Sequence, residues 1–259
     1  MFIRCLLCLL LLATRAFTAD PFKDYPPEYR AALSEMARTF NDRDFERTLV
    51  AIDKADRIVP PTVHTLNTRA AIMIERHQWE EGIKLCERAL KIEPKYYPAR
   101  FNLAEIPLMQ SKYAEAREAF QKMLDENPRD ELVQFRIFLT YLLEKNDTAA
   151  REALGKIKFP SDSAAFYYAN AAWEFQHANE AEGKAWVARG NWVFGYDKIV
   201  NFSESLVQLG WIERPVRDAK DRATLAPKRD KAGEEKPKPN LELKIEEPKV
   251  EPIGEVKPK

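Results

Sequence analysis

The sequence predicts an all-α fold, a right-handed solenoid in which short antiparallel helix pairs stack on one another. Three prolines, Pro60, Pro94 and Pro128, lie 34 residues apart, and each ends a segment patterned as two amphipathic helices. A repeat of about 34 residues in a helical pattern is typical of stacked helix pairs. We therefore expect a repeat domain over residues 28–211, with roughly five pairs and one capping helix.

Apolar and small residues recur at fixed distances before each proline. Five residues before the prolines lie Ala55, Ala89 and Met123. Eight residues before them lie Ile52, Cys86 and Phe120. Positions three apart share one face of a helix. These residues are therefore expected to form the buried face of the second helix in each pair.

Two polar residues and an aromatic residue mark the start of each second helix. The three tripeptides are Arg43-Asp44-Phe45, His77-Gln78-Trp79 and Ser111-Lys112-Tyr113. Three residues after the aromatic residue come Gly82 and Ala116, whereas Thr48 takes this place in the first pair. Helices approach to about 8–10 Å only where the side chains at the crossing are small. These positions therefore predict where the two helices of a pair cross.

With these residues in view, the chain resembles the tetratricopeptide repeat (TPR) family. The resemblance rests on two segments, namely Ala70, Trp79, Gly82, Ala89, Leu90, Ile92 and Pro94, and then Leu103, Ala104, Tyr113, Ala116, Phe120, Leu124 and Pro128. It implies a solenoid whose first helices line a concave face that binds another polypeptide.

Later segments match the repeat less closely. A fourth pair, with Tyr141 and Ala150, ends early at Phe159-Pro160, and a fifth runs from about Ala164 to Gly190. Terminal repeats face water on one side, so departures from the pattern are expected there.

One more amphipathic helix is expected from Tyr196 to Trp211. Its apolar residues lie three and four positions apart, at Ile199, Phe202, Leu206 and Leu209. We expect this helix to cap the solenoid. Within the third pair, Pro107 is expected to bend its helix, because proline removes a backbone donor.

Residues 1–19 are expected to form a secretory signal peptide. Arg4 and Arg15 flank an apolar run over residues 5–13, which is shorter than the roughly 20 residues that span a membrane. Cleavage is expected after Ala16 or Ala19, and retention as a short anchor is the alternative. The protein is thus expected to be of an exported bacterial type, in the periplasm or cell envelope, without an integral membrane span in the mature chain.

Residues 213–259 contain no aromatic residue and are rich in Pro, Lys and Glu. Such a segment buries too little apolar surface to offset the entropy of ordering, so it is expected to be a disordered tail.

No residue pattern indicates catalysis, a cofactor or a metal site. His64, His77 and His177 lie on different helices or turns, without cysteine or carboxylate partners at ligand spacing. Lys and Arg together number 41, as do Asp and Glu, so bulk charge does not favour nucleic acid. Cys86, the only cysteine after signal removal, is expected in the core. We therefore expect a non-catalytic protein with no cofactor and no nucleic-acid partner.

The repeat register assigns a set of mostly apolar residues to the concave face implied by the resemblance. From the second pair these are His64, Asn67, Ala71 and Ile74. The later pairs supply the predicted partner-binding groove, formed by Phe101, Glu105, Leu108, Met109, Phe135, Leu139, Leu142, Leu143, Phe166, Asn170 and Trp173. Only Asn102 and Arg136 lie near the places where related domains clamp a carboxyl terminus.

An apolar groove suits an amphipathic or extended apolar segment of a partner protein. We therefore expect an adaptor for protein–protein interaction in the cell envelope, with a protein or peptide partner. The alternative is a self-associating scaffold, a possible homo-oligomer, whose groove is filled by its own C-terminal helix or by a second copy.

Overall fold

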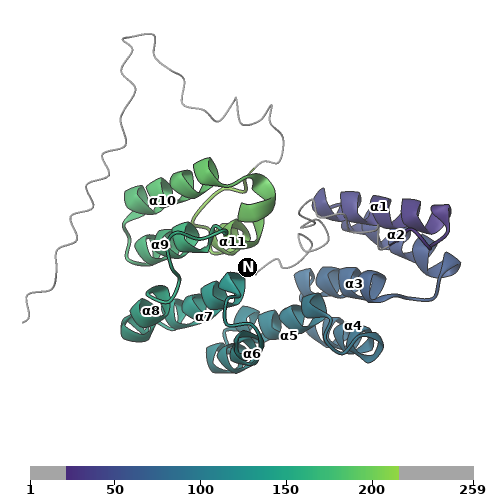
Figure 1. The fold of residues 1–259 in the computed structure, drawn as a ribbon, viewed down its shortest axis with the longest axis horizontal. Coiled ribbons are helices and arrows are strands. Elements are labelled where there is room, and N and C mark those ends of the chain that lie inside the picture. Colours follow the sequence, from purple (N-terminus) through teal and green to yellow (C-terminus); the bar gives the residue numbers. More distant parts are fainter. Residues whose placement is uncertain (1–21, 216–259) are drawn as a thin grey trace, which may run out of the picture. The chain divides into compact units, whose positions relative to one another are not determined.

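The computed structural model describes residues 22–215, and these contain eleven helices and no strand (Figure 1). The helices are α1 Pro27–Asn41, α2 Phe45–Ile58, α3 Val63–Glu75, α4 Trp79–Ile92, α5 Tyr97–Met109, α6 Tyr113–Glu126, α7 Glu131–Leu143, α8 Asp147–Leu154, α9 Ala165–Gln176, α10 Glu180–Val193 and α11 Tyr196–Gln208. The expected signal peptide over residues 1–19 and residues 216–259 of the expected tail lie outside the described residues. None of the described helices combines the length and apolar composition needed to cross a bilayer.

Ten of these helices form five pairs, as the 34-residue period predicts. Within each pair, α1–α2 through α9–α10, the two helices pack against each other, and each pair contacts the next (Figure 1). The first helix of one pair also contacts the first helix of the next pair. α3 contacts α5, and α7 contacts α9. The prediction of an all-α stack of helix pairs is therefore confirmed.

The turn inside every pair contains one residue in the left-handed region. These residues are Arg43, His77, Ser111, Lys145 and Ala178, with φ between 60° and 62°. The N–H of each donates to the carbonyl three residues earlier, and the next N–H donates to the carbonyl five residues earlier. These two backbone hydrogen bonds end the first helix and reverse the direction of the chain. The same turn, repeated five times, sets the same antiparallel geometry in each pair.

Small residues near the start of the second helices, Gly82 as predicted and Gly183 in addition, sit where a larger side chain would collide with the paired helix. A Cβ atom added to Gly82 would lie 2.7 Å from Cγ1 of Ile74, and one added to Gly183 would lie 2.8 Å from the ring of Phe175. Ala116 is fully buried at the equivalent place. In the first pair Thr48 is also fully buried, and its hydroxyl donates to Asp44 O at 2.7 Å.

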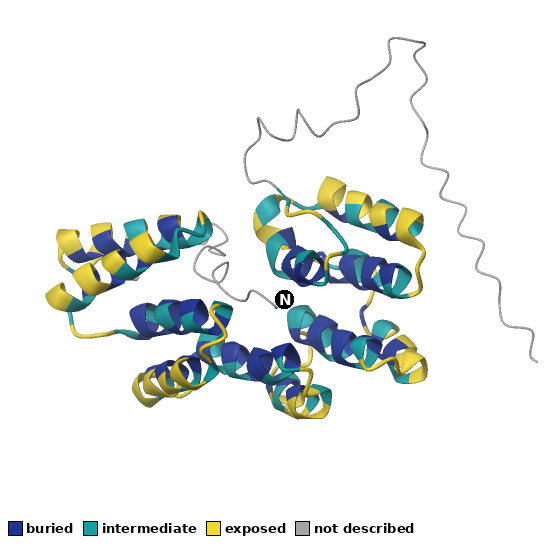
Figure 2. Ribbon diagram, turned by 180° about the vertical axis from the view of Figure 1, so that it is seen from behind, coloured by how far each residue is buried: buried dark blue, intermediate teal, exposed yellow. Residues whose placement is uncertain are grey.

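From the second pair onward, burial differs sharply between the two helices of a pair. No residue of α3, α5, α7 or α9 is exposed, whereas α2, α4, α6 and α10 each present an exposed outer face (Figure 2). A helix that is buried on all sides belongs to a core. Cys86 on α4 is likewise fully buried, as predicted, and burial raises the pKa of its thiol to about 12. Pro107 lies inside α5, which continues for two further residues.

The expected capping helix, α11, packs on the last pair and also reaches the pair before it. Besides α9 and α10, α11 contacts α7, the first helix of the preceding pair. Its Phe202 ring lies 5.4 Å from Phe135 on α7 and 6.2 Å from Tyr168 on α9, centroid to centroid. We call this side of α7 and α9 the inner face. A helix continuing the stack would contact only the last pair, so α11 instead covers the inner face of the last two pairs.

Charged side chains connect α11 to the first two pairs. Arg43, in the α1–α2 turn, lies 3.1 Å from Glu75 on α3 and 3.9 Å from Glu204 on α11. Arg214 pairs with the same Glu204 at 2.8 Å. Burial raises the pKa of Glu75 to about 7, although Arg43 opposes the shift, and burial also raises the pKa of Glu204. Burial therefore outweighs the ion pairs at both carboxyl groups.

The close approach at Gly183 predicts that Gly183→Ala destabilises the fold. The added methyl group would displace the Phe175 ring, and such overpacking costs about 1–3 kcal/mol. Gly155→Ala is the matched control, because a Cβ there lies 3.5 Å from its nearest neighbour, an ordinary contact. Urea unfolding of both variants measures the difference, and equal stability of the two would contradict the crossing at Gly183.

The raised pKa of Glu75 predicts a pH dependence of stability. A carboxyl group that binds its proton more tightly in the folded chain makes the unfolding free energy fall as pH rises between its two pKa values. For Glu75 this window runs from about 4.5 to about 7. Glu75→Gln cannot ionise, so the wild type should lose stability relative to this variant between about pH 4.5 and about pH 7. Parallel pH profiles in urea unfolding would contradict this result.

Candidate functional site

The structure places the predicted groove residues mostly in the interior. Seven are buried, with side chains no more than 2% exposed, namely Phe101, Glu105, Leu108, Met109, Phe135, Leu139 and Leu142. The other four are half-buried, namely Leu143, Phe166, Asn170 and Trp173. This burial corrects the expectation of an open apolar face. Binding of a partner by this set stays a prediction.

Contacts between neighbouring helices account for much of this burial. The ring of Phe101 on α5 packs edge-on against Phe120 on α6, with centroids 5.4 Å apart. Phe135 on α7 packs against Phe138 and against Phe202 of α11. Burying an aromatic side chain of this size is a major favourable contribution to stability. These residues therefore hold helices together, and α11 already covers Phe135.

Two polar contacts lie inside the same set of first helices. Arg136 on α7 forms an ion pair with Glu105 on α5, and both side chains are fully buried. Asn102 donates to Oδ1 of Asn67 at 2.9 Å, which joins α5 to α3. Arg136 also donates to the carbonyl of Asn201 on α11 at 3.1 Å. Asn102 and Arg136 therefore connect neighbouring helices in the interior. They do not lie on an open face, where a carboxylate clamp would need them.

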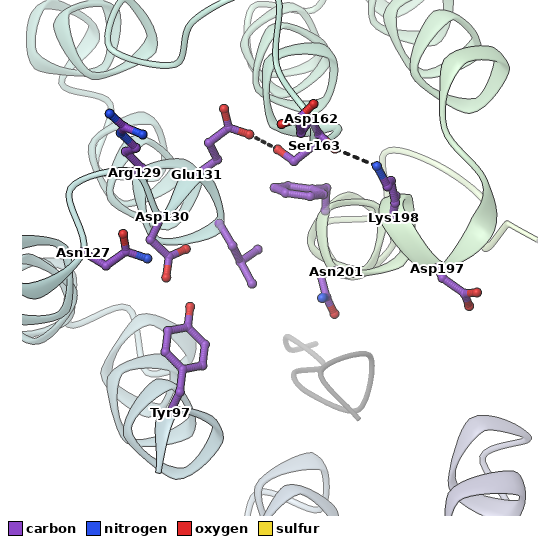
Figure 3. A pocket seen from close by; sticks show the side chains of 12 residues that line it. Tyr97, Asn127, Arg129, Asp130, Glu131, Asp162, Ser163, Asp197, Lys198 and Asn201 are labelled. Atoms are coloured by element: carbon purple, nitrogen blue, oxygen red, sulfur yellow. Dashed lines mark hydrogen bonds between the residues drawn. The ribbon is translucent and has the colours of Figure 1, made fainter. Parts of the chain in front are cut away.

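A pocket of about 550 Å³ opens beside α11, at the edge of the inner face (Figure 3). It lies where the starts of α5, α7 and α11 meet the α6–α7 and α8–α9 connections. Its lining residues are Tyr97, Asn127, Arg129, Asp130, Glu131, Leu132, Asp162, Ser163, Asp197, Lys198, Asn201 and Phe202. Volumes of this size accommodate a small ligand or a few side chains of a bound segment.

The charged groups around the pocket are largely used in local contacts. Asp130 accepts the Val133 N–H at 3.1 Å and so caps α7. Glu131 accepts the hydroxyl of Ser163, and Lys198 donates to the carbonyl of Asp162 (Figure 3). Four acidic and two basic side chains line the pocket, and the acidic residues lie near helix starts, where the helix dipole favours negative charge. Acidic side chains therefore outnumber basic ones around the pocket, four to two.

Two observations describe the chemistry available among the described residues. Within residues 22–215, no group of three or more His, Cys, Asp or Glu side chains is placed to hold a metal ion. Leu132 and Phe202 contribute apolar surface to the pocket among its charged lining residues. Protein–protein interfaces likewise combine apolar and polar surface.

Sequence reasoning missed most of the pocket. Leu132 could have been found, because it shares the repeat position of His64 and Phe166, which lie 68 residues before it and 34 after it. Asn201 and Phe202 could not, because they belong to α11, which lies outside the repeat and carries no register relative to α7.

Comparisons with known proteins agree with this architecture. The sequence profile of the tetratricopeptide repeat family matches residues 73–134. Over 86 residues the chain is 29% identical to Stress-induced-phosphoprotein 1 of Caenorhabditis elegans, a match that covers 33% of this chain and 25% of that protein. Over 101 residues it is 27% identical to Small glutamine-rich tetratricopeptide repeat-containing protein 2 of Mycosarcoma maydis, covering 39% of this chain and 29% of that one. The matches thus span less than a third of the length of these two relatives.

A solved structure supports the fold over a larger part of the chain. The crystal structure of a tetratricopeptide repeat protein from Parabacteroides merdae superposes with a TM-score of 0.57 at 17% sequence identity, and the match covers 70% of each chain. Residues 73–134 therefore match the tetratricopeptide repeat family, and the described helices share the fold of a solved tetratricopeptide repeat protein.

Proposed function

We propose that this protein is a non-catalytic adaptor that binds an apolar or amphipathic segment of a partner protein at the inner face of α7 and α9. Tetratricopeptide repeats serve protein–protein interaction, and the pocket beside α11 is the observation that supports this location. Apolar Leu132 and Phe202 lie in the pocket, where a bound segment can reach the edge of the inner face.

We further propose that the adaptor acts after export, in the bacterial cell envelope. The support is the short apolar run over residues 5–13, flanked by Arg4 and Arg15. A protein in that compartment with stacked repeats and no catalytic constellation suits the assembly or tethering of other envelope proteins.

Site-specific photo-crosslinking in the native host tests the location of partner binding. A benzophenone amino acid at Leu132, in the pocket, should form a covalent adduct with a second protein. The same amino acid at Val50, which is 67% exposed on α2, is the matched control and should form none. Adducts of equal yield at both positions, or at Val50 alone, would place the interaction elsewhere.

A self-associating scaffold is the second candidate, and one surface favours it. Trp192 on α10 is 88% exposed, and Phe159 before α9 is 60% exposed. The ring of Phe159 contacts Phe166 and Tyr167, which in turn contact Trp186, so aromatic surface extends across α9 and α10. Exposed apolar patches of this kind often mark contact surfaces.

Mass measurement by light scattering during size exclusion decides between the two candidates. The adaptor reading predicts a monomer for the wild type and for Trp192→Ala. A wild-type dimer that dissociates in Trp192→Ala, with an unchanged melting temperature, would favour the scaffold.

A further inference from the structure

We propose that α11 is an internal occupant of a helix-binding surface, and that the partner is an amphipathic helix which resembles α11 and displaces it from α7 and α9. This inference rests on the proposed adaptor function and names the chemistry of its partner.

The contacts of α11 with the inner face resemble those of a docked helical ligand. Phe202 inserts between Phe135 of α7 and Tyr168 of α9, with centroid distances of 5.4 and 6.2 Å. Ile199 and Leu206, three residues before and four after Phe202, are buried on the same helix. This is the spacing by which an amphipathic helix binds a groove, with one aromatic anchor flanked by aliphatic residues.

One contact to α11 is independent of its side chains. Arg136 donates to the backbone carbonyl of Asn201 at 3.1 Å. Any helix in the same position presents a carbonyl oxygen there, although helical carbonyls are normally engaged within the helix. Arg136 can therefore bind a foreign helix as it binds α11, and Phe202 marks where that helix needs its own aromatic anchor.

The polar residues of α11 fit this surface poorly. Oγ of Ser205 and Oε1 of Gln208 are buried and have no hydrogen-bond partner among the described residues. A buried polar atom without a partner loses its hydration and gains nothing in return. Glu204 beside them is also buried, and its carboxylate pairs with Arg214 and Arg43. A partner helix with apolar residues at the places of Ser205 and Gln208 would avoid this cost and bind the same surface more tightly than α11 does.

The pocket provides a place where displacement can begin. It is lined by Phe202 and Asn201 of α11 and by Leu132 of α7, so one side of the α7–α11 contact is open to solvent. A partner helix can contact Leu132 there before α11 has moved.

A fluorescent peptide with the sequence of residues 196–211 tests the proposal on the full chain. Tethered α11 competes at a high effective concentration, so the wild type should bind the peptide weakly. Phe202→Ala in the chain weakens α11 and should raise peptide affinity at least about tenfold, which is about 1.4 kcal/mol. Val207→Ala, at a half-buried position of α11, is the matched chain control and should change affinity little. A peptide that itself carries Phe202→Ala should not bind.

Ser205→Ala in the chain tests the opposite effect, a lower peptide affinity, and does not rely on weakening the fold. Removing the unpaired hydroxyl should hold α11 more tightly, so peptide affinity should fall below that of the wild type. Hydrogen exchange supplies a second readout, because peptide binding should accelerate exchange of the α11 amides.

Three results would overturn the proposal. These are equal peptide affinity of the wild type and Ser205→Ala, peptide binding that leaves α11 exchange unchanged, and no peptide binding to a folded Phe202→Ala chain. If a partner still crosslinks at Leu132 in any of these cases, the adaptor function stands and only the displacement of α11 is wrong.

Discussion

The close approach of the two helices in each pair is the constraint on which the rest of the structure depends. At Gly82 and Gly183 no space exists for even a methyl group, and Ala116 and Ala150 are fully buried at the equivalent positions. A left-handed residue in each intervening turn sends the chain back at the same angle. Because both features recur, the pairs share one antiparallel arrangement and can stack on one another, although α8 is shorter than the other second helices.

Stacking equivalent pairs places the first helices α3, α5, α7 and α9 in the interior. Each of these four helices contacts its own partner and its neighbouring pairs, and α7 and α9 also contact α11. This explains why Phe101 and Phe135, which the register assigns to a concave face, are fully buried. The face to which the repeat register assigns the predicted groove is therefore not bare. α11 already covers part of this face, and a pocket lies open beside α11.

α11 is held on the inner face by both favourable and unfavourable contacts. Phe202 packs well, and Arg136 donates to a backbone carbonyl, but Glu204, Ser205 and Gln208 place polar atoms in a buried setting. Buried charges gain from their partners only what remains after desolvation. The raised pKa values of Glu75 and Glu204 show that burial outweighs the arginines here. α11 therefore has a defined position on the inner face but is bound less tightly than an apolar helix would be. A helix that a partner displaces needs this combination.

The sequence by itself determined the helix pairs, their crossings and the burial of Cys86, because these depend on residues that recur every 34 positions. It also contained the signal for Leu132, through the shared position of His64 and Phe166. The left-handed turns were visible only as recurring polar pairs such as His77-Gln78, since no glycine marks them. Only the tertiary structure decided where α11 lies and which half of the predicted groove it covers. Phe202 meets Phe135 across 67 residues of chain, outside any repeat, and a contact of that kind follows from how helices fill space together, which no local pattern encodes.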